Sequence, residues 1–367
     1  MSRVFVSGLG AVSPAGWGVA AMCEALAKGE PLPTQPLEGP GRSRPLQARL
    51  VPPPATRLPF LSHPRLRRTS LITHYASAAA LEAMARLHRN NDHNQRVGVV
   101  ICLQAGCVRF SCRFFEEALS DPATASPLLF PETVFAAPAS HIAAVLGNVP
   151  LAYTLLGDSA CFLQGVSLGA QWLGEKRVDA CLILGCEESD WILADALWHF
   201  EHQAIVSAGA GAVCLSLDPT TSLGVELDAI TDAHTYTTRT NRARAARLMR
   251  EQLPTGSPAE LLCDGLSGSS RADGPERTAW HDWTGPRVSP RRILGEGLMA
   301  VGAWQCVAAC QSIISGEYAA ATVSLVGSNH QAIGARFVRS DSLLEDGSWK
   351  MGDRPISNLP SSISQRE

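Results

Sequence analysis

The fold class can be inferred first from residues 139–189, ASHIAAVLGNVPLAYTLLGDSACFLQGVSLGAQWLGEKRVDACLILGCEES. Their hydrophobic periodicity predicts a helix over residues 140–146, a short strand over 152–155, an apolar helix over 160–173 and an apolar strand over 178–184. A strand that is apolar on both faces has to be covered on both sides. Such strands alternating with helices are typical of an α/β architecture with largely parallel sheets.

The same alternation extends outward from this stretch in both directions. Turn residues follow the first strand at 8–10 and 13–14, and the small residues 208–212 are predicted to form a turn that leads into a strand. The patterns predict strands over residues 4–6, 96–103, 213–217, 223–230, 260–263 and near Val323, and helices over residues 19–28, 71–87, 241–252 and 297–315.

Composition excludes several classes of protein. The chain has 367 residues, of which 46% are apolar and 18% charged, with a formal net charge of −3. This apolar content rules out a disordered chain, and the near-neutral net charge gives no reason to expect binding to nucleic acid or to an anionic membrane. No run of about 18 apolar residues occurs, so we expect no membrane span. The first ten residues lack the pattern of a signal peptide, so we expect a cytoplasmic protein.

Two segments depart from this alternation. Residues 31–66 are rich in proline and arginine and hold ten of the chain's 24 prolines, which predicts a long surface loop because proline interrupts both helix and sheet. Residues 341–367 are polar, contain serine and proline and show no periodicity, which predicts a tail or a loosely packed extension.

The cysteines are numerous, and one of them stands out. The chain has 11, scattered, with no C-x-x-C pair and no zinc-type spacing, so we expect reduced, buried thiols. Cys161, in LLGDSACF, lies at a predicted strand-to-helix junction. The free N–H groups of a helix N-terminus lower the pKa of a thiol there, and a thiolate can take an acyl group from a thioester. Among this many cysteines, one at a helix start also arises by chance.

Two segments carry a resemblance to a known family. Residues 4–30, VFVSGLGAVSPAGWGVAAMCEALAKGE, resemble the N-terminal signature of the β-ketoacyl synthases, which belong to the thiolase superfamily, and residues 139–189 resemble their active-site segment. Ser159-Ala160-Cys161 takes the place of the nucleophile elbow, and Asp179 and Gly185-Cys186-Glu187 take the places of the strand that follows.

The resemblance covers residues 2–340 and implies the thiolase-type α-β-α-β-α layered sandwich of two similar halves. The N-terminal half would span residues 1–217 and carry the cysteine elbow. The C-terminal half would span residues 218–340, and residues 341–367 would follow it as the polar tail.

The two histidines of a condensing enzyme are missing from the matching positions. Asp264 or Gly265, depending on register, stands at the first, and Glu296 stands at the second, with Arg291 in place of the family's lysine. Carboxylates are anionic near pH 7 and would repel a developing enolate rather than stabilise it. His330, in the altered loop at residues 326–332, is a candidate for a displaced base or for a simple hydrogen-bond partner.

The pattern is similar to the chain-length-factor partners of type II polyketide ketosynthases, and most of all to the ketosynthase-like subunits of aryl polyene and xanthomonadin-type systems. It implies a heterodimer with an active ketosynthase, an acyl carrier protein as partner, and no metal or organic cofactor, because the carrier's phosphopantetheine brings the substrate. Chain length factors commonly carry glutamine at the elbow, whereas this chain keeps Cys161.

Two other functions stay open. The chain could be an independent divergent β-ketoacyl synthase or acyltransferase that uses Cys161 with Glu296 or His330. It could also be a homodimeric acyl-binding protein without enzymatic activity.

Clusters of basic residues allow smaller interpretations. Arginines in and near the proline-rich loop would attract an acidic carrier protein or form a solvated basic loop; they are Arg42, Arg44, Arg49, Arg65, Arg67 and Arg68. Four arginines on one predicted helix are interpreted as a solvated stripe; they are Arg242, Arg244, Arg247 and Arg250.

Overall fold

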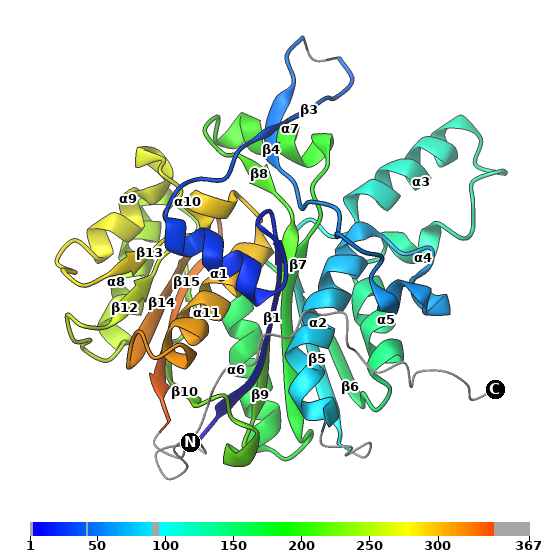
Figure 1. Ribbon diagram of the computed structural model, residues 1–367. Helices are drawn as coiled ribbons and strands as arrows, with labels where there is room; N and C mark the ends of the chain where they lie inside the picture. The colour runs from blue at the N-terminus through cyan, green and yellow to red at the C-terminus, as the bar shows by residue number, and fades with distance from the viewer. Residues whose placement is uncertain (1–2, 42, 90–94, 341–367) are drawn as a thin grey trace.

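A computed structural model describes residues 3–41, 43–89 and 95–340 (Figure 1). Its strands are β1 (Phe5–Ser13), β2 (Gly16–Trp17), β3 (Gln35–Leu37), β4 (Leu46–Arg49), β5 (Val97–Leu103), β6 (Leu151–Leu156), β7 (Ala180–Glu187), β8 (Val206–Ser207), β9 (Gly209–Ser216), β10 (Val225–Ile230), β11 (His234–Thr235), β12 (Leu261–Cys263), β13 (Arg287–Val288), β14 (Ala320–Val326) and β15 (Gln331–Arg339). Its helices are α1 (Val19–Lys28), α2 (Leu71–Arg89), α3 (Val108–Ser120), α4 (Phe130–Thr133), α5 (Ala137–Leu146), α6 (Cys161–Gly174), α7 (Trp191–Phe200), α8 (Arg239–Gln252), α9 (Ser270–Ala279), α10 (Pro290–Leu294) and α11 (Met299–Ile314), with short 3-10 turns at Pro59–Ser62, Pro64–Leu66 and Pro219–Thr221.

The main sheet contains one strand order twice. Its path runs β13-β12-β14-β15-β10-β1-β9-β7-β5-β6. One group is β1-β9-β7-β5-β6 and the other is β10-β15-β14-β12-β13. When the five strands of each group are numbered by their order in the chain, both groups have the spatial order 1-5-4-2-3. The two groups join where β1 pairs with β10. On this order we propose that the groups correspond to the two halves expected on either side of residue 218, a division that stays a prediction.

The sheet is mixed, so the expectation of largely parallel sheets is wrong. The strands β7, β5 and β6 are parallel, as are β14, β12 and β13, whereas β1, β9, β10 and β15 run antiparallel to their neighbours. The reason is visible between β14 and β15, which only residues 327–330 separate. A parallel crossover needs about a dozen residues or more, so such a short link returns the chain antiparallel.

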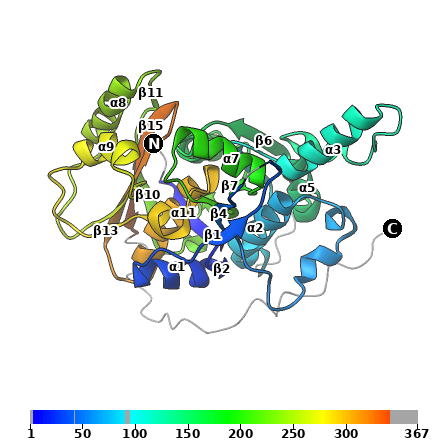
Figure 2. The ribbon, with the colours of Figure 1, turned by 90° about the horizontal axis from the view of Figure 1, so that it is seen from above.

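Helices and sheets form layers, which confirms the expected α-β-α-β-α sandwich. The first cluster of buried side chains joins α6 and α11 to the inner faces of both strand groups. A second cluster packs α2 and α5 on the outer face of the N-terminal group, and a third packs α8 and α9 on the outer face of the C-terminal group. Figure 2 shows α8 and α9 on one side, α11 in the middle and α2 and α5 on the other side.

The central position of α11 follows from its sequence. Thirteen of its 16 residues are buried, and a helix that is apolar all round is stable only when its whole surface is covered. Trp304 anchors it, since the indole Nε1 donates to the carbonyls of Val12 and Ala210, both at 3.1 Å. The predicted helices over 160–173 and 297–315 are therefore the two central helices of the fold.

The proline-rich segment is more regular than predicted. Although most of residues 31–66 lies outside regular structure, β3 and β4 form a hairpin there, and β4 pairs in parallel with β8 to make a separate three-stranded sheet. β4 contains no proline, and β3 accommodates Pro36 because it is an edge strand of this sheet, where a missing N–H is tolerated. Of the arginines singled out in this segment, Arg42 lies outside the described residues, as does the whole segment 341–367.

Several boundaries and elements differ from the expectations. The first strand continues through the glycines at 8–10 to Ser13, and the small residues after Ala208 belong to β9 rather than to a turn. The predictions missed α3, α7, α9 and β15. Within the described residues, no helix is both long and apolar enough to cross a membrane.

Glycine in β1 allows α2 to approach the strand closely, which gives a first prediction. A Cβ at Gly8 would overlap the carbonyl oxygen of Ala83 in α2, so Gly8→Ala has to push strand and helix apart. We expect the free energy of unfolding to fall by about 1–3 kcal/mol, the cost of overpacking a core. Urea unfolding measures it, with Gly174→Ala in α6 as the control, since no heavy atom lies within 4 Å of a Cβ built there. Equal stability of the two variants would contradict the prediction.

Candidate active site

The elbow at Cys161 is built by a four-residue turn between β6 and α6. The amide of Gly157 donates to the carbonyl of Leu103 at 3.1 Å, and the amide of Cys161 donates to the carbonyl of Asp158 at 2.8 Å. A Cβ on Gly157 would lie 2.8 Å from the Cβ of Cys161, so the turn needs glycine there. Cys161 is the first residue of α6 and is 3% exposed, so its position at a strand-to-helix junction is confirmed.

A second thiol accompanies Cys161. The Sγ of Cys102, the penultimate residue of β5, donates to the carbonyl of Cys161 at 3.8 Å. The neighbouring thiol of Cys102 lowers the pKa of Cys161, whereas burial and the charge of Asp158 raise it. Burial raises the pKa of Cys102 well above its ordinary range. The sequence interpretation missed this pairing, because Cys102 was placed among the ordinary core cysteines and β5 meets α6 only in the fold.

Asp158 joins the elbow to the loop after β14. One carboxylate oxygen accepts from the amides of Asn329 at 3.2 Å and His330 at 2.9 Å, and the other accepts from the amide of Ala160 at 3.3 Å. Burial raises the pKa of this carboxyl, and the amide hydrogen bonds oppose the shift. Gly327 makes the contact possible, since a Cβ there would overlap the carboxylate. The backbone of His330 is thus part of this arrangement, while its side chain is exposed.

Asp264 lies directly after β12 and is fully buried. Its Oδ1 accepts from the hydroxyl of Ser289 at 2.5 Å and the amide of Leu266 at 3.3 Å, and its Oδ2 lies 3.5 Å from Nη1 of Arg287. Burial raises the pKa of Asp264, and these partners oppose the shift. The carboxyl is therefore held by its own neighbours at the position where the resemblance expects a histidine.

Glu296 is held in the same way by an arginine. Its Oε2 forms an ion pair with Nη2 of Arg291, and its Oε1 accepts from the amide of Leu298 at 3.0 Å. The other terminal nitrogen of Arg291 donates to the carbonyl of Gly265 at 3.4 Å. Arg291 thus connects Glu296 with Gly265, the residue after Asp264, and Glu296 neutralises its charge.

Helix α11, which follows Glu296 in the chain, packs against the elbow. A Cβ on Gly302, in the first turn of α11, would overlap the carbonyl oxygen of Ser159, so the helix packs directly against the turn that carries Cys161. Within residues 3–41, 43–89 and 95–340, no hydrogen bond or ion pair connects the thiol of Cys161 with the side chain of Asp264, Glu296 or His330.

The chemistry available at the site follows from these partners. A thiol with a lowered pKa at a helix N-terminus is suited to attack a thioester carbonyl. Stabilising an enolate needs donors aimed at the developing charge. Glu296 is engaged by Arg291, and Asp264 by Ser289 and Arg287, so neither is free to supply such a donor. The described residues contain no group of three or more metal-ligating side chains.

Comparisons with known proteins agree with this geometry at the level of the fold. No protein-family model matches the sequence, and no curated protein matches it either. Among solved structures, a β-ketoacyl synthase from Burkholderia phymatum superposes with a TM-score of 0.77 at 16% identity, covering 92% of this chain and 100% of that chain. The fold is that of the ketosynthases.

Two further structures with the ketosynthase fold are complexes. A chain of the ketosynthase in complex with its chain length factor from Xenorhabdus doucetiae matches with a TM-score of 0.76 at 13% identity, covering 92% of this chain and 98% of that chain. A chain from a type II polyketide acyl carrier protein bound to its ketosynthase matches with a TM-score of 0.74 at 14% identity, covering 92% and 99%.

The contact between the two thiols gives a second prediction. Cys102→Ala removes the thiol that donates to the carbonyl of Cys161, so we expect the pKa of Cys161 to rise and its thiolate fraction near pH 7.5 to fall. The rate of alkylation by iodoacetamide, followed against pH by peptide mass spectrometry, measures this. Cys214→Ala, which removes a buried thiol bonded to Met84, is the control. An unchanged pH profile in Cys102→Ala would show that Cys102 does not influence the nucleophile.

Proposed function

We propose that this chain is a ketosynthase-like subunit that pairs with an active β-ketoacyl-carrier-protein synthase, in the role of a chain length factor of type II polyketide or aryl polyene biosynthesis. The observation that carries the proposal is the ion pair between Arg291 and Glu296, in the segment that leads into α11, the helix that packs against the cysteine elbow. The two side chains neutralise each other's charge, and position 296 has no imidazole that could take part in decarboxylative condensation. The hydrogen-bond donors that stabilise the enolate would then come from the partner's own active site.

Known assemblies with this fold support the pairing. The structures that match include a ketosynthase bound to its chain length factor and a ketosynthase bound to its acyl carrier protein. A subunit of this kind contributes to the shape of the acyl tunnel during malonyl condensation, and we propose the same contribution here. Substrates would arrive on the phosphopantetheine of a carrier protein, with no other cofactor. A cytoplasmic location stays a prediction.

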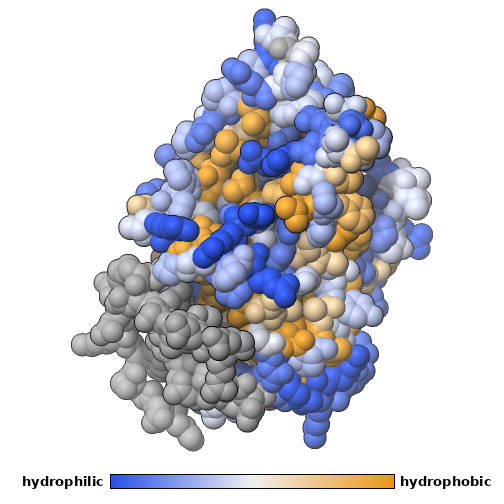
Figure 3. Space-filling view, turned by 90° about the vertical axis from the view of Figure 1, so that its right-hand side faces the viewer, coloured by the Kyte–Doolittle hydropathy of each residue, from blue (hydrophilic) through white to orange (hydrophobic). Residues whose placement is uncertain are grey.

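An apolar surface on the chain is suited to a partner. Strand β6 ends the path of the main sheet, and its Tyr153 and Leu156 are each 55% exposed. Exposed apolar side chains of α3, α4 and the adjoining turns continue this surface; they are Phe115, Leu119, Leu128, Phe130, Val134 and Phe135. Figure 3 shows apolar residues gathered on this side of the molecule, interrupted by charged ones. An edge strand beside exposed aromatic and aliphatic residues is a template for pairing with another chain.

Basic residues beside this surface are suited to an acidic carrier protein. Arg65, Arg67 and Arg68 are exposed in and after the 3-10 turn at Pro64–Leu66, which packs near α5. Such charges mainly increase the rate of association. Arg49 does not belong to this group, contrary to the expectation, because it is buried and donates to the carbonyls of Leu32 at 2.7 Å and Arg292 at 3.3 Å.

A second candidate function is acyl transfer by Cys161 itself, favoured by its lowered pKa. In that reaction the Sγ of Cys161 would attack the carbonyl carbon of an acyl thioester. The bond between that carbon and the carrier sulfur would break, and the proton of Cys161 would end on the released carrier thiol. Intact-mass measurement after incubation with an acyl carrier thioester detects the added acyl group, and Cys161→Ala is the control.

Charge placed on the apolar surface tests the pairing. We expect Leu156→Asp, made in this chain and co-expressed with its ketosynthase, to lose co-purification and condensation activity, because an aspartate on the edge of β6 would be buried unpaired in the interface. Phe200→Asp in α7 adds the same charge at a side chain that is 79% exposed outside this surface, so it should co-purify like the unaltered chain. Retention of the partner by Leu156→Asp would exclude this surface.

A further inference from the structure

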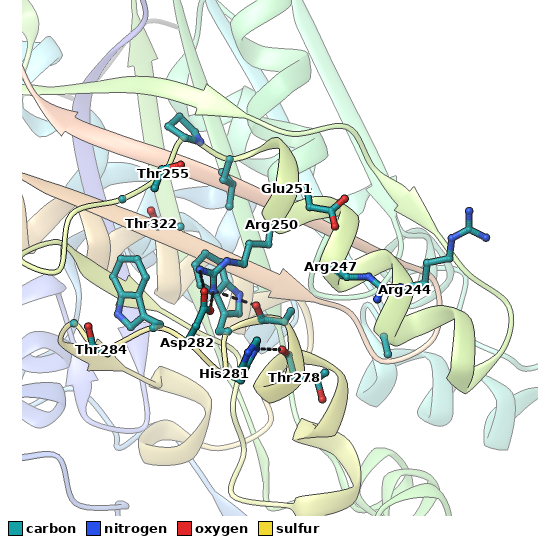
Figure 4. A pocket seen from close by; sticks show the side chains of 18 of the residues that line it. Arg244, Arg247, Arg250, Glu251, Thr255, Thr278, His281, Asp282, Thr284 and Thr322 are labelled. Atoms are coloured by element: carbon teal, nitrogen blue, oxygen red, sulfur yellow. Dashed lines mark hydrogen bonds and ion pairs between the residues drawn. The ribbon is translucent and has the colours of Figure 1, made fainter.

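A cleft of about 880 Å³ lies on the outer layer of the C-terminal strand group, between α8 and the segment that follows α9 (Figure 4). None of Cys161, Asp264, Glu296 and His330 lines it. The third core cluster, which joins α8 to α9, forms its base, whereas β6 and the apolar surface lie at the opposite end of the sheet path.

One wall of the cleft is fixed by Arg250. Its guanidinium lies 4.3 Å from the centre of the Trp280 ring, and its Nη1 is 2.8 Å from Oδ1 of Asp282 and donates to the carbonyl of Ala279 at 3.1 Å. The Trp280 ring meets Trp283 edge-to-face at 5.6 Å. Arg250 therefore neutralises Asp282 and holds the segment after α9 in place, and the ring contacts make this wall rigid.

Two arginines at the rim of the cleft have no acidic partner within the described part of the chain. Arg244 and Arg247 line the cleft from α8 and are exposed, and neither forms an ion pair within the described part of the chain. Three residues apart on a helix, they stand about 4.5 Å apart along its axis. Arg242, between the lining residues Asn241 and Ala243, is different, since it donates to the carbonyls of Ala272 and Val326. The four arginines are thus not one solvated stripe.

Hydroxyl and imidazole groups face the same cleft. Thr255 and Thr284 line it, and His281 also lines it, with Nδ1 3.0 Å from the carbonyl of Thr278 (Figure 4). Thr278 lines it too, but its hydroxyl donates to the carbonyl of Gly274 at 2.8 Å. A hydrogen bond from Nδ1 leaves Nε2 available to a ligand. Of the carboxylates in the lining, Asp282 is paired with Arg250, which leaves Glu251 against two unpaired arginines.

We propose that this cleft binds an organic phosphate of nucleotide size, with Arg244 and Arg247 on the phosphate. Guanidinium groups bind phosphate through paired, charge-assisted hydrogen bonds, and the hydroxyls of Thr255 and Thr284 would donate to the remaining oxygens. The volume lies within the roughly 300–1,000 Å³ that is usual for small-molecule sites. The proposal does not depend on the pairing with a ketosynthase, because the cleft and the apolar surface share no residue.

Calorimetric titration of the full chain with pyrophosphate, ADP and coenzyme A tests the proposal. We expect ADP or coenzyme A to bind more tightly than pyrophosphate, since the cleft has room for more than the phosphates. Arg244→Ala with Arg247→Ala should weaken binding at least tenfold. The control is Arg57→Ala with Arg292→Ala, which removes the same two charges from exposed positions outside the cleft and should leave affinity unchanged.

Two results would overturn the proposal. One is the absence of binding by all three probes at millimolar concentration. The other is equal weakening in both double variants, which would mean that general charge rather than the cleft attracts phosphate. Binding of an acidic carrier protein that is lost in Arg244→Ala with Arg247→Ala, without binding of any small phosphate, would assign the arginines to a protein partner and also reject the proposal.

Discussion

Glu296→Ala is expected to lower the free energy of unfolding by about 3–5 kcal/mol, the cost of leaving one partner of a buried ion pair without its counter-charge. The side chains of Arg291 and Glu296 are 16% and 9% exposed, so solvent replaces little of the lost interaction. The substitution also frees the amide of Leu298, which now donates to Glu296 at 3.0 Å. Guanidinium chloride unfolding, monitored by far-ultraviolet circular dichroism, measures the loss.

A double variant distinguishes a structural pair from a catalytic acid. Arg291→Met with Glu296→Leu removes both charges and keeps apolar volume, and we expect it to recover most of the stability lost in Glu296→Ala, since apolar side chains replace buried ion pairs at little cost. If Glu296→Ala changed the free energy of unfolding by less than about 1 kcal/mol, the ion pair would not stabilise the fold, and Glu296 would not be a structural partner of Arg291.

Glu276→Gln is expected to change how stability depends on pH. Glu276, in α9, is 4% exposed, and burial raises its pKa from 4.5 to about 8, with the charge of Asp264 adding to the shift. Between these values the folded state keeps a proton that the unfolded state has lost. Stability therefore falls as pH rises, by about 1.4 kcal/mol for each pH unit, and the contribution is fully present only below pH 4.5.

The glutamine variant removes this dependence, because its amide keeps the neutral shape of the protonated acid. We expect its unfolding free energy to fall less steeply than that of the unaltered protein between pH 5 and pH 8, and the variant to be the more stable of the two at pH 8. Chemical unfolding at several pH values provides the comparison. Glu317→Gln, at an exposed position, should leave the slope unchanged. Parallel pH curves for Glu276→Gln and the unaltered protein would mean that Glu276 is ionised in the fold.

The elements that were predicted best from the sequence are those that consist almost entirely of apolar residues and are buried. The central helices α6 and α11 and the strand β7 are apolar runs, and each was placed to within two residues at most boundaries. Helix α9 was missed because Gly274 and Pro275 lie inside it. Strand β15 was missed because Arg336 interrupts its apolar pattern, and only the fold supplies the partners Glu260 and Asp228 that hold this arginine.

In the candidate site, too, local features were predictable from the sequence and contacts between distant segments were not. The elbow at Cys161 is local, so the segment around it predicts its geometry. The partners that define its chemistry are distant in sequence: Cys102 lies on another strand, Asp158 meets the loop after β14, and Arg291 reaches Gly265. The substitutions at the histidine positions were visible in the sequence, whereas the ion pair that satisfies one of them depends on the packing of α10 and α11.

Co-expression of this chain with a ketosynthase that carries the complete cysteine and histidine set tests whether the chain acts as a partner subunit. The measurement is carbon–carbon bond formation from acyl and malonyl carrier proteins by each chain alone and by both together, with light scattering for the mass of each sample. We predict a one-to-one heterodimer and condensation only when the ketosynthase is present. A homodimer of this chain that forms the carbon–carbon bond alone would contradict the claim.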